Sequence, residues 1–376
     1  MLLLKQPVTI IMTYDSYVLQ TMLTCIGNKR KLIPHLKEIV LDLKKRINKE
    51  QICVFDGFAG SGVVSRMLKT CIGNVISNDM EYYSFLMQKC YLNTPSEIEQ
   101  KKIKEHIDEM NVIAENGPFV EGFISRLYSP KNTKEPKEGE RCFYTRENAL
   151  IIDSLMTYIF EKVEPSLFCY CMVPLLNKAS IHTNTAGVFK GFYKDGKVGK
   201  FGGKGENALH RIMGKIKLDM PEWYPNSNCK VYNEDINTLI KTIPEDFDIM
   251  YLDPPYNQHP YGSNYFMLIL IAKNEEPQSI SKVSGIPSNW NKSNYNYTKK
   301  ATESMKQLLH DGLAKATYVV LSYNNEGIIK DKEWKEIFEP YTIEKKEIVY
   351  DTFKGCRNLS SRNNKVNEII YIISKK

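Results

Sequence analysis

The stretch DIMYLDPPY, residues 248 to 256, ends an apolar run with an acid, two prolines and an aromatic ring. Prolines fix φ and lack an N–H donor, so Pro254 and Pro255 stop the run abruptly and expose their carbonyl groups. Asp253 adds a carboxylate, and Tyr256 adds a flat ring for stacking. Together these groups suit a planar molecule that carries an amino group.

A second motif is VFDGFAGSG, a short apolar run followed by Asp56 and a glycine-rich turn. Gly57, Gly60 and Gly62 allow a tight turn between a strand and a helix, and they let a ligand approach the backbone closely. The motif is not GxGxxG, and no P-loop lysine follows it. It therefore favours a ligand without phosphates, held by backbone groups and an acid. Taken alone, such a turn is as often purely structural.

Two further acids follow segments that are typical of strands, Asp79 after NVISN and Asp235 after NCKVYNE. Asp79 comes 23 residues after Asp56, where an acid can accept hydrogen bonds from ribose hydroxyls, and Asp235 can meet an adenine amino group. Each acid alone is better explained as a helix cap or turn residue. Because open α/β sheets bind ligands at the carboxyl edge, the acids jointly predict a nucleoside pocket.

The elements that must position these residues alternate along the chain. A helix is expected over 31–46, strands in QICVFDG and NVISND, and helices in VVSRMLKT and MEYYSFLMQKCYL. This β-α-β-α order predicts a parallel sheet covered on both faces. Strand patterns resume in 228–236, 246–256 and 317–327, and the last two, 345–353 and 367–374, fit an antiparallel pair that closes the sheet.

The strand pattern stops between residues 84 and 225, a stretch far longer than an ordinary connection. We predict a catalytic domain made of 22–83 and 226–376, with 84–225 inserted as a mostly helical domain that carries binding function. Within the insert, residues 178–219 hold nine Lys/Arg against three Asp/Glu, an excess of +6. Positive charge interleaved with aromatic residues suggests a polyanion partner, although a solvated lysine-rich loop also explains it.

Length and amino-acid composition limit the classes of protein to which the chain can belong. The chain has 376 residues, 42% hydrophobic and 25% charged, as expected of an ordinary globular protein. No apolar run approaches the roughly 20 residues that span a bilayer, and the amino terminus lacks the features of a signal peptide, so no membrane partner is expected. The nine cysteines contain no CxxC pair and the six histidines no HExxH, so we predict reduced thiols, a cytoplasmic protein and no metal.

DGFAGSG followed by DPPY resembles the S-adenosylmethionine-dependent amino-methyltransferases of DNA. The order is also similar to one group of them: IGNKRKLIPHL, then DGFAGSG, then a long insert, then DPPY. In this the chain resembles the alpha-group, D12-class N6-adenine methyltransferases, which include the Dam-type and FokI-type modification enzymes. The resemblance covers about 22–83 and 228–376, and it implies a Rossmann-like α/β sheet with an inserted target-recognition domain.

The resemblance also implies roles for single residues. The turn at Cys25, Gly27, Asn28 and Lys29 would hold the methionine end of S-adenosyl-L-methionine, although the family usually has an aromatic residue where Cys25 stands. Lys29 would also touch DNA. The other cofactor contacts would be Asp56, Phe58, Gly60, Asp79, Asp235, Ile236 and Asp253.

The proline corner would then be catalytic through Asp253, Pro254, Pro255 and Tyr256. Asp253 and the Pro254 carbonyl would accept the two N–H bonds of the adenine amine and stabilise its developing positive charge. Tyr256 would stack on a base flipped out of the duplex. No covalent intermediate is required.

Double-stranded DNA is the implied partner, with Lys190, Lys194, Lys204, Arg211 and Arg357 as the predicted contacts outside the cofactor site. A cognate restriction endonuclease would accompany a modification enzyme. The resemblance favours a monomer or weak dimer, encoded by a prokaryote or a phage and acting near the nucleoid.

Three alternatives remain open at this point. N4-cytosine methylation uses the same mechanism, but there the acid is commonly a serine, so Asp253 favours adenine. A methyltransferase of RNA or of protein glutamine has a related proline motif, whereas the basic insert and the GNK turn favour DNA. A catalytically silent nucleic-acid-binding protein would be expected to have lost the acids that are all present here.

Overall fold

A seven-stranded sheet forms the centre of the computed structural model, which describes residues 14–20, 22–23, 29–225, 228–351 and 365–376. The strand order is β5-β2-β1-β6-β7-β9-β8. The strands are β1 (Cys53–Asp56), β2 (Asn74–Asn78), β5 (Cys229–Tyr232), β6 (Ile249–Leu252), β7 (Tyr318–Asn324), β8 (Tyr341–Asp351) and β9 (Lys365–Lys375). Neighbours from β5 to β7 pair in parallel, and β9 pairs antiparallel with both β7 and β8. The predicted α/β class and the antiparallel closing pair are confirmed.

The central strand β6 is apolar throughout because both faces of the sheet are covered there. In β6, Ile249 and Tyr251 belong to one core cluster, and Met250 and Leu252 belong to the other. Successive side chains of a strand point to opposite faces, so a buried parallel strand shows an unbroken apolar run rather than alternation. This is why IMYL leads directly into the proline corner.

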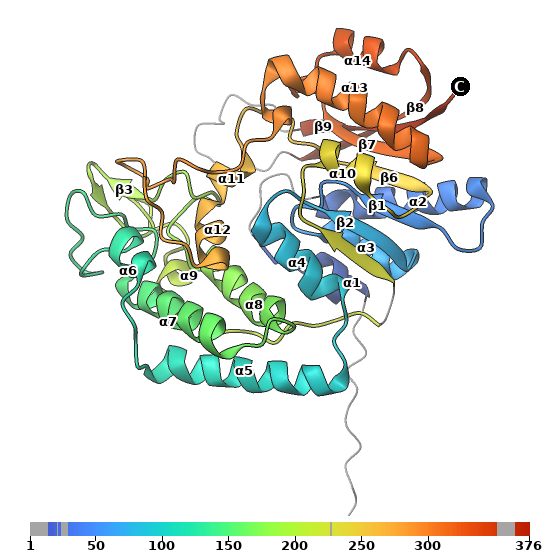
Figure 1. The fold of residues 1–376 in the computed structure, drawn as a ribbon. Coiled ribbons are helices and arrows are strands. Elements are labelled where there is room, and N and C mark those ends of the chain that lie inside the picture. Colours follow the sequence, from blue (N-terminus) through green and yellow to red (C-terminus); the bar gives the residue numbers. More distant parts are fainter. Residues whose placement is uncertain (1–13, 21, 24–28, 226–227, 352–364) are drawn as a thin grey trace, which may run out of the picture.

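Helices cover each face of the sheet (Figure 1). Those on one face, with the short helices of the amino-terminal part, are α1 (Tyr14–Leu19), η1 (Arg30–Leu32), α2 (Ile33–Ile47), α3 (Val63–Cys71) and α4 (Tyr82–Leu92). Those on the other face are α10 (Ile236–Thr242), α13 (Thr298–Lys315) and α14 (Asp331–Phe338). The helices predicted in 31–46, in VVSRMLKT and in MEYYSFLMQKCYL are all present, as α2, α3 and α4.

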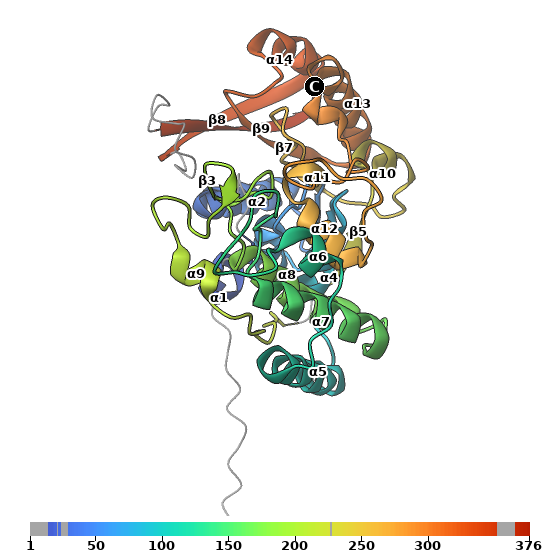
Figure 2. The same cartoon turned by 90° about the vertical axis from the view of Figure 1, so that its left-hand side faces the viewer.

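The segment between β2 and β5 continues from α4 into a group of helices beside the sheet (Figures 1 and 2). Its elements are α5 (Glu97–Asn116), α6 (Phe123–Tyr128), α7 (Arg146–Lys162), α8 (Phe168–Ile181), the two-residue strands β3 (Lys194–Asp195) and β4 (Val198–Gly199), and α9 (Leu209–Met213). Helices that follow β6, namely α11 (Tyr261–Asn264) and α12 (Phe266–Lys273), join this group, since α12 packs against α8 and α4. The short helix η2 (Asn294–Asn296) then leads into α13. The chain after the proline corner therefore connects the sheet with the insert.

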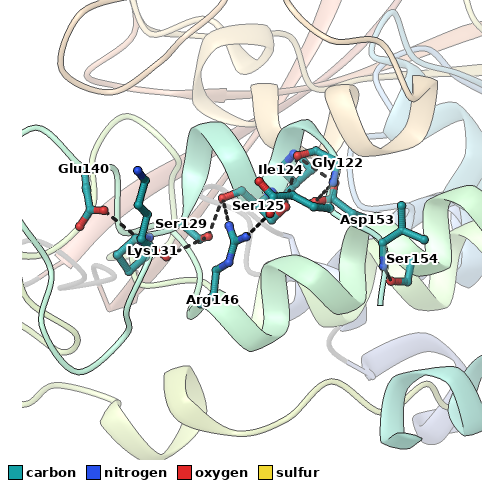
Figure 3. A network of polar contacts seen from close by, with 12 residues as sticks. Gly122, Ile124, Ser125, Ser129, Lys131, Glu140, Arg146, Asp153 and Ser154 are labelled. Atoms are coloured by element: carbon teal, nitrogen blue, oxygen red, sulfur yellow. Dashed lines mark hydrogen bonds and ion pairs between the residues drawn. The ribbon is translucent and has the colours of Figure 1, made fainter. Parts of the chain in front are cut away.

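A buried carboxylate joins two helices of the insert (Figure 3). Asp153 on α7 accepts hydrogen bonds from the backbone N–H groups of Gly122, Ile124 and Ser125, at 2.9, 3.1 and 2.8 Å. These are N–H groups at the start of α6, which have no partner within their own helix. Arg146, also on α7, donates to the Ser125 carbonyl at 2.8 Å. The network fixes α6 on α7 and so supports the loops that extend from these helices.

Across the described residues, no helix is both long enough and apolar enough to cross a membrane.

Candidate functional site

A cavity lies at the carboxyl ends of β1, β2 and β6, the edge at which open α/β sheets bind ligands. Its empty space, including the open mouth, is about 980 Å³, enough for a nucleoside-sized ligand. The sequence-predicted residues that line it are Lys29, Phe58, Gly60, Asp79, Asp235, Ile236, Asp253 and Pro255. The fold thus brings together residues that lie more than 200 positions apart in the chain.

The glycine turn after β1 is held from both sides. Asp79 accepts hydrogen bonds from the N–H groups of Gly60 (2.7 Å) and Glu81 (2.8 Å). The hydroxyl of Ser84 and the amide of Gln88 donate to the Gly60 carbonyl at 2.6 and 3.2 Å. Gly60 has a φ of +52°, and a Cβ at this position would meet no atom within 4 Å. The turn is therefore rigid, and it presents bare backbone to open space.

Asp56, the last residue of β1, is fully buried and is not among the residues that line the cavity. The Ser65 hydroxyl donates to its Oδ2 at 2.6 Å and lies 2.9 Å from the Ser77 hydroxyl. Burial raises the pKa of Asp56 to about 7. Its predicted contact with the cofactor stays a prediction, because here the carboxyl supports the turn from inside the core.

Asp235 is both a helix cap and a residue of the cavity wall, so the two interpretations of this acid do not exclude each other. It is the N-cap of α10 and accepts a hydrogen bond from the Thr238 N–H at 3.2 Å, and it also lines the cavity beside Ile236. The side chain of Asn78 links this region to the glycine turn, because its amide donates to the carbonyls of Gly57 (3.2 Å) and Glu234 (3.1 Å). The turn after β1 and the start of α10 thus form one wall.

The proline corner follows β6 directly, and its acid is part of an ion-pair cluster. The ammonium group of Lys29 lies 2.9 Å from Asp253 Oδ1 and 2.8 Å from Glu368 Oε1. The side chains of Lys29 and Glu368 are 4% and 1% exposed, whereas that of Asp253 is 18% exposed. We call these three residues the Lys29 cluster. Only its Asp253 member combines partial exposure with a place at the cavity wall close to the prolines.

The charge state of Asp253 is set by opposing effects. Burial raises the pKa of its carboxyl, Lys29 lowers it and Glu368 raises it, with a result of about 6. A pKa near 6 leaves the carboxylate as the main form at neutral pH. Asp253 is therefore available as a hydrogen-bond acceptor, although the structure already pairs it with Lys29.

Tyr256 stands after the two prolines and is half-buried. Its carbonyl accepts a hydrogen bond from the Ile328 N–H at 3.0 Å, and its ring packs edge-on against Tyr323 at a centroid distance of 6.4 Å. The ammonium of Lys29 lies 5.8 Å from the same ring. The ring is thus held beside the ammonium that pairs with Asp253, although Tyr256 is not among the residues that line the cavity.

Comparison with known families decides the class of this protein. The family model for D12 class N6 adenine-specific DNA methyltransferases matches residues 26–350. This chain is a D12-class adenine-specific DNA methyltransferase. The family named from DGFAGSG and DPPY is confirmed, and adenine rather than cytosine is the base of the family.

Three relatives of this methyltransferase are also named as methyltransferases or modification methylases. M.NlaIII from Neisseria lactamica, a type II methyltransferase, is 30% identical over 361 residues, which cover 93% of this chain and 98% of the relative. Modification methylase StsI from Streptococcus sanguinis is 27% identical and M.FokI from Planomicrobium okeanokoites 28% identical, each over 93% of this chain. The chain spans nearly all of M.NlaIII but only 52% of StsI and of M.FokI.

The predicted DNA contacts of the methyltransferase lie in different surroundings. Lys190 is exposed, and its Nζ is 3.1 Å from Nδ1 of His259, which follows the proline corner by a few residues. Lys194 lies 4.7 Å from the Phe192 ring, and Lys204 pairs with Asp195 at 3.3 Å. The partly buried Arg211 donates a hydrogen bond to the Ile181 carbonyl. The structure therefore places Lys190 beside the chain that follows the proline corner.

Other predicted residues of the methyltransferase lie outside the described part of the chain, namely Cys25, Gly27, Asn28 and Arg357. Within the described part, no group of three or more His, Cys, Asp or Glu side chains is arranged to hold a metal ion.

Sequence reasoning missed Glu368. The signal was a single acid in the apolar run NEIIYIIS, because charged side chains are almost never fully buried unless they are paired.

Proposed function

We propose that this methyltransferase transfers a methyl group from S-adenosyl-L-methionine to the N6 amino group of an adenine flipped out of a short, specific sequence in duplex DNA. The observation that carries the proposal is the continuity of the cavity. One space is bordered both by the glycine turn with Asp79 and by Asp253 of the proline corner. Methyl transfer requires donor and acceptor in one aligned geometry, and a shared cavity permits this alignment.

The cavity wall fits the charge of S-adenosyl-L-methionine, which brings a sulfonium with an electrophilic methyl group. Acids outnumber cations in the lining, among them Asp79, Asp235 and Asp253, and Lys29 is its one Lys or Arg among the described residues. Such a wall attracts a cationic ligand and disfavours phosphates. The open backbone at Gly60 leaves space for a ligand that lies against the turn. In this assignment Asp79 and Asp235 hold the nucleoside, as the family resemblance implies.

The proline corner supplies the groups that the adenine amine needs. This amine is a poor nucleophile because its lone pair is delocalised into the ring. Asp253 and the Pro254 carbonyl accept its two N–H bonds, which stabilises the positive charge that develops on nitrogen. Tyr256 stacks on the base, and flipping allows the base to reach this corner. During transfer the nitrogen gains the methyl group and loses one proton, while the bonding electrons stay with sulfur.

Direct product analysis tests the reaction. The protein is incubated with duplex DNA and S-adenosyl-L-methionine, and the nucleosides are then separated and identified by mass spectrometry. We expect N6-methyladenine, and sequencing of modified bases should place it within one short sequence. Formation of N4-methylcytosine, or DNA recovered without any modification, would refute the proposed function.

The rate of methyl transfer should depend on pH through Asp253. The carboxylate is the hydrogen-bond acceptor, and the pKa of Asp253 is raised to about 6. The single-turnover rate at saturating substrates should therefore be level above about pH 6 and fall about tenfold per pH unit below it. A limb near pH 7 or 8 would instead point to Asp56 or Glu81, whose pKa values burial raises to about 7 and about 8.

The insert is proposed to hold the DNA. Its loop between α8 and α9 carries the basic segment and contacts the chain that follows the proline corner. The N–H of Phe189 donates to the Asn264 carbonyl at 2.7 Å, and the Ser284 hydroxyl donates to the Lys190 carbonyl at 2.6 Å. The backbone at Lys190 is thereby held in a fixed position relative to the chain after the proline corner, as a phosphate contact next to a flipped base requires.

Replacing Lys190 and Lys194 by glutamine should weaken DNA binding and reduce its salt dependence. Each lost phosphate contact lowers the slope of log K against log salt by roughly 0.9, so the double variant should lose up to about 1.8. Fluorescence anisotropy over a salt series measures this. The matched control is Lys101→Gln with Lys104→Gln, two exposed lysines of α5. An equal slope in wild type and in the Lys190 and Lys194 variant would remove these residues from the DNA interface.

A further inference from the structure

Glu368 is a buried carboxylate inside an apolar strand. In β9 it is paired with Asn324 of β7 and with Ile348 of β8, and the next residues are Ile369 and Ile370. Only 1% of its side chain is exposed. Burying a charge here is costly unless it is paired, so a residue of this kind calls for a physical reason.

The contacts of Glu368 supply that reason. Its Oε1 lies 2.8 Å from the ammonium of Lys29, and the Ser322 hydroxyl donates to the same oxygen. The same ammonium lies 2.9 Å from Asp253 Oδ1. One cation therefore bridges a carboxylate on the wall of the cavity and a second carboxylate deep in the sheet. In its ionised form the Lys29 cluster carries one more negative than positive charge.

This bridge raises a problem for the proposed reaction. An adenine amine that donates to Asp253 has to compete with the ammonium of Lys29 for the carboxylate. If Asp253 were the sole partner, the ammonium would be left unpaired on release, in a position where only 4% of the side chain is exposed. An uncompensated buried charge is strongly destabilising. Lys29 thus needs a second partner that stays in place while Asp253 binds the base.

We propose that Glu368 is a positioning residue that retains the ammonium of Lys29 while Asp253 turns to the amino group of the target base. This inference rests on the proposed role of Asp253. Glu368 touches neither base nor cofactor, and it acts through Lys29. Because β9 pairs on both sides, its backbone is fixed, and the carboxylate is a stationary partner. Lys29 then stays neutralised both before and during methyl transfer.

The charge of Glu368 also acts on Asp253 directly. The groups that surround Asp253 are Lys29, Glu368 of β9, Tyr251 of β6 and, more distantly, Asp56 of β1. Glu368 raises the pKa of Asp253 and Lys29 lowers it. Removing the charge of Glu368 therefore leaves burial as the effect that opposes the lowering by Lys29. The pKa of Asp253 falls, and its carboxylate persists to lower pH.

The variant Glu368→Gln tests the inference, because it changes two observables in a defined way. The plateau of the single-turnover rate should fall about 10- to 100-fold, since Lys29 is now committed to Asp253. The acid limb of the pH profile, where the rate falls at low pH, should at the same time shift to a lower pH than in the wild type. Loss of packing alone would lower the rate without moving the limb. The matched control is Glu347→Gln on β8, an exposed acid paired with Lys345, which should change neither observable.

A second variant keeps the test decisive if Glu368→Gln folds poorly. Glu368→Asp retains the charge but withdraws it from Lys29 by one methylene, so its plateau should lie between those of the wild type and Glu368→Gln. Its acid limb should stay close to that of the wild type. A wild-type plateau in Glu368→Asp, or a wild-type rate and limb in Glu368→Gln, would overturn the positioning role. An Asp253→Asn variant that methylates adenine normally would instead refute the proposed function.

Discussion

Asp253→Ala is expected to lower the single-turnover rate of methyl transfer by at least about 100- to 1,000-fold, the cost of losing a charge-stabilising group at the reacting atom. The variant should still fold. Replacing Asp253 by alanine leaves Lys29 and Glu368 as an ion pair. The buried positive charge and the buried negative charge then balance each other. Rapid-quench measurement of methylated DNA gives the rate, and calorimetric titration with S-adenosyl-L-methionine shows whether the cofactor site survives.

A matched variant separates loss of the acid from general damage. Asp311→Asn changes a carboxyl on α13 that accepts hydrogen bonds from Gln307 and His310, outside the cavity lining. It should retain both the rate and the affinity for S-adenosyl-L-methionine. If Asp253→Ala transfers methyl groups at the wild-type rate, the carboxylate is not the group that activates the amine. If it loses affinity for S-adenosyl-L-methionine as strongly as rate, Asp253 belongs to the cofactor site instead.

The parts of this site that follow strands were predictable because they depend on local pattern. Asp79 and Asp253 each come directly after a strand, and parallel strands place their carboxyl ends at one edge. The sequence therefore predicts that these residues meet, without any knowledge of the strand order. The Asp235 cap was equally local, since an acid before a helical pattern bonds the first turn.

Contacts between distant segments were not predictable in the same way. The pairing of Lys29 with Glu368 joins residues near opposite ends of the chain, and it depends on β9 lying between β7 and β8. The sequence showed an antiparallel pair but not which strand would be central. Likewise, α12 follows the proline corner in sequence, yet it packs against α8 of the insert. A domain boundary inferred from composition alone cannot show such packing, because apolar helices have similar sequences whether they pack against the sheet or against the insert.

The position of Asp56 shows a further limit. A carboxylate at a strand end before a glycine turn suggested a ligand contact, yet its side chain is fully buried and bonded to Ser65. Strand residues alternate between faces and neighbours decide what covers them, so exposure at a strand end is a tertiary property. Its buried state is also what raises the pKa of Asp56 to about 7.

The same ion-pair cluster leads to the largest effect that we expect on stability. Lys29→Met removes the one cation of the Lys29 cluster and leaves Asp253 and Glu368 facing each other without a counter-charge. Breaking a buried pair in this way costs about 3–5 kcal/mol of unfolding free energy. Urea denaturation followed by circular dichroism measures the loss. The double variant Lys29→Met with Glu368→Gln should recover part of it, because only the partly exposed Asp253 charge then remains.

The loss in Lys29→Met should also depend on pH, with a sign fixed by the two carboxyls. Without Lys29 their pKa values in the folded protein rise above those in the unfolded chain. The folded state then binds protons more tightly, so stability is retained at low pH and lost as pH rises through the raised values. The deficit relative to wild type should be larger at about pH 7 than at about pH 5. Lys69→Met is the control, since this buried lysine donates to the Leu92 carbonyl and the Thr94 hydroxyl instead of a carboxylate. A deficit of equal size at both pH values in Lys29→Met would mean that the two carboxyls do not depend on Lys29 for their charge.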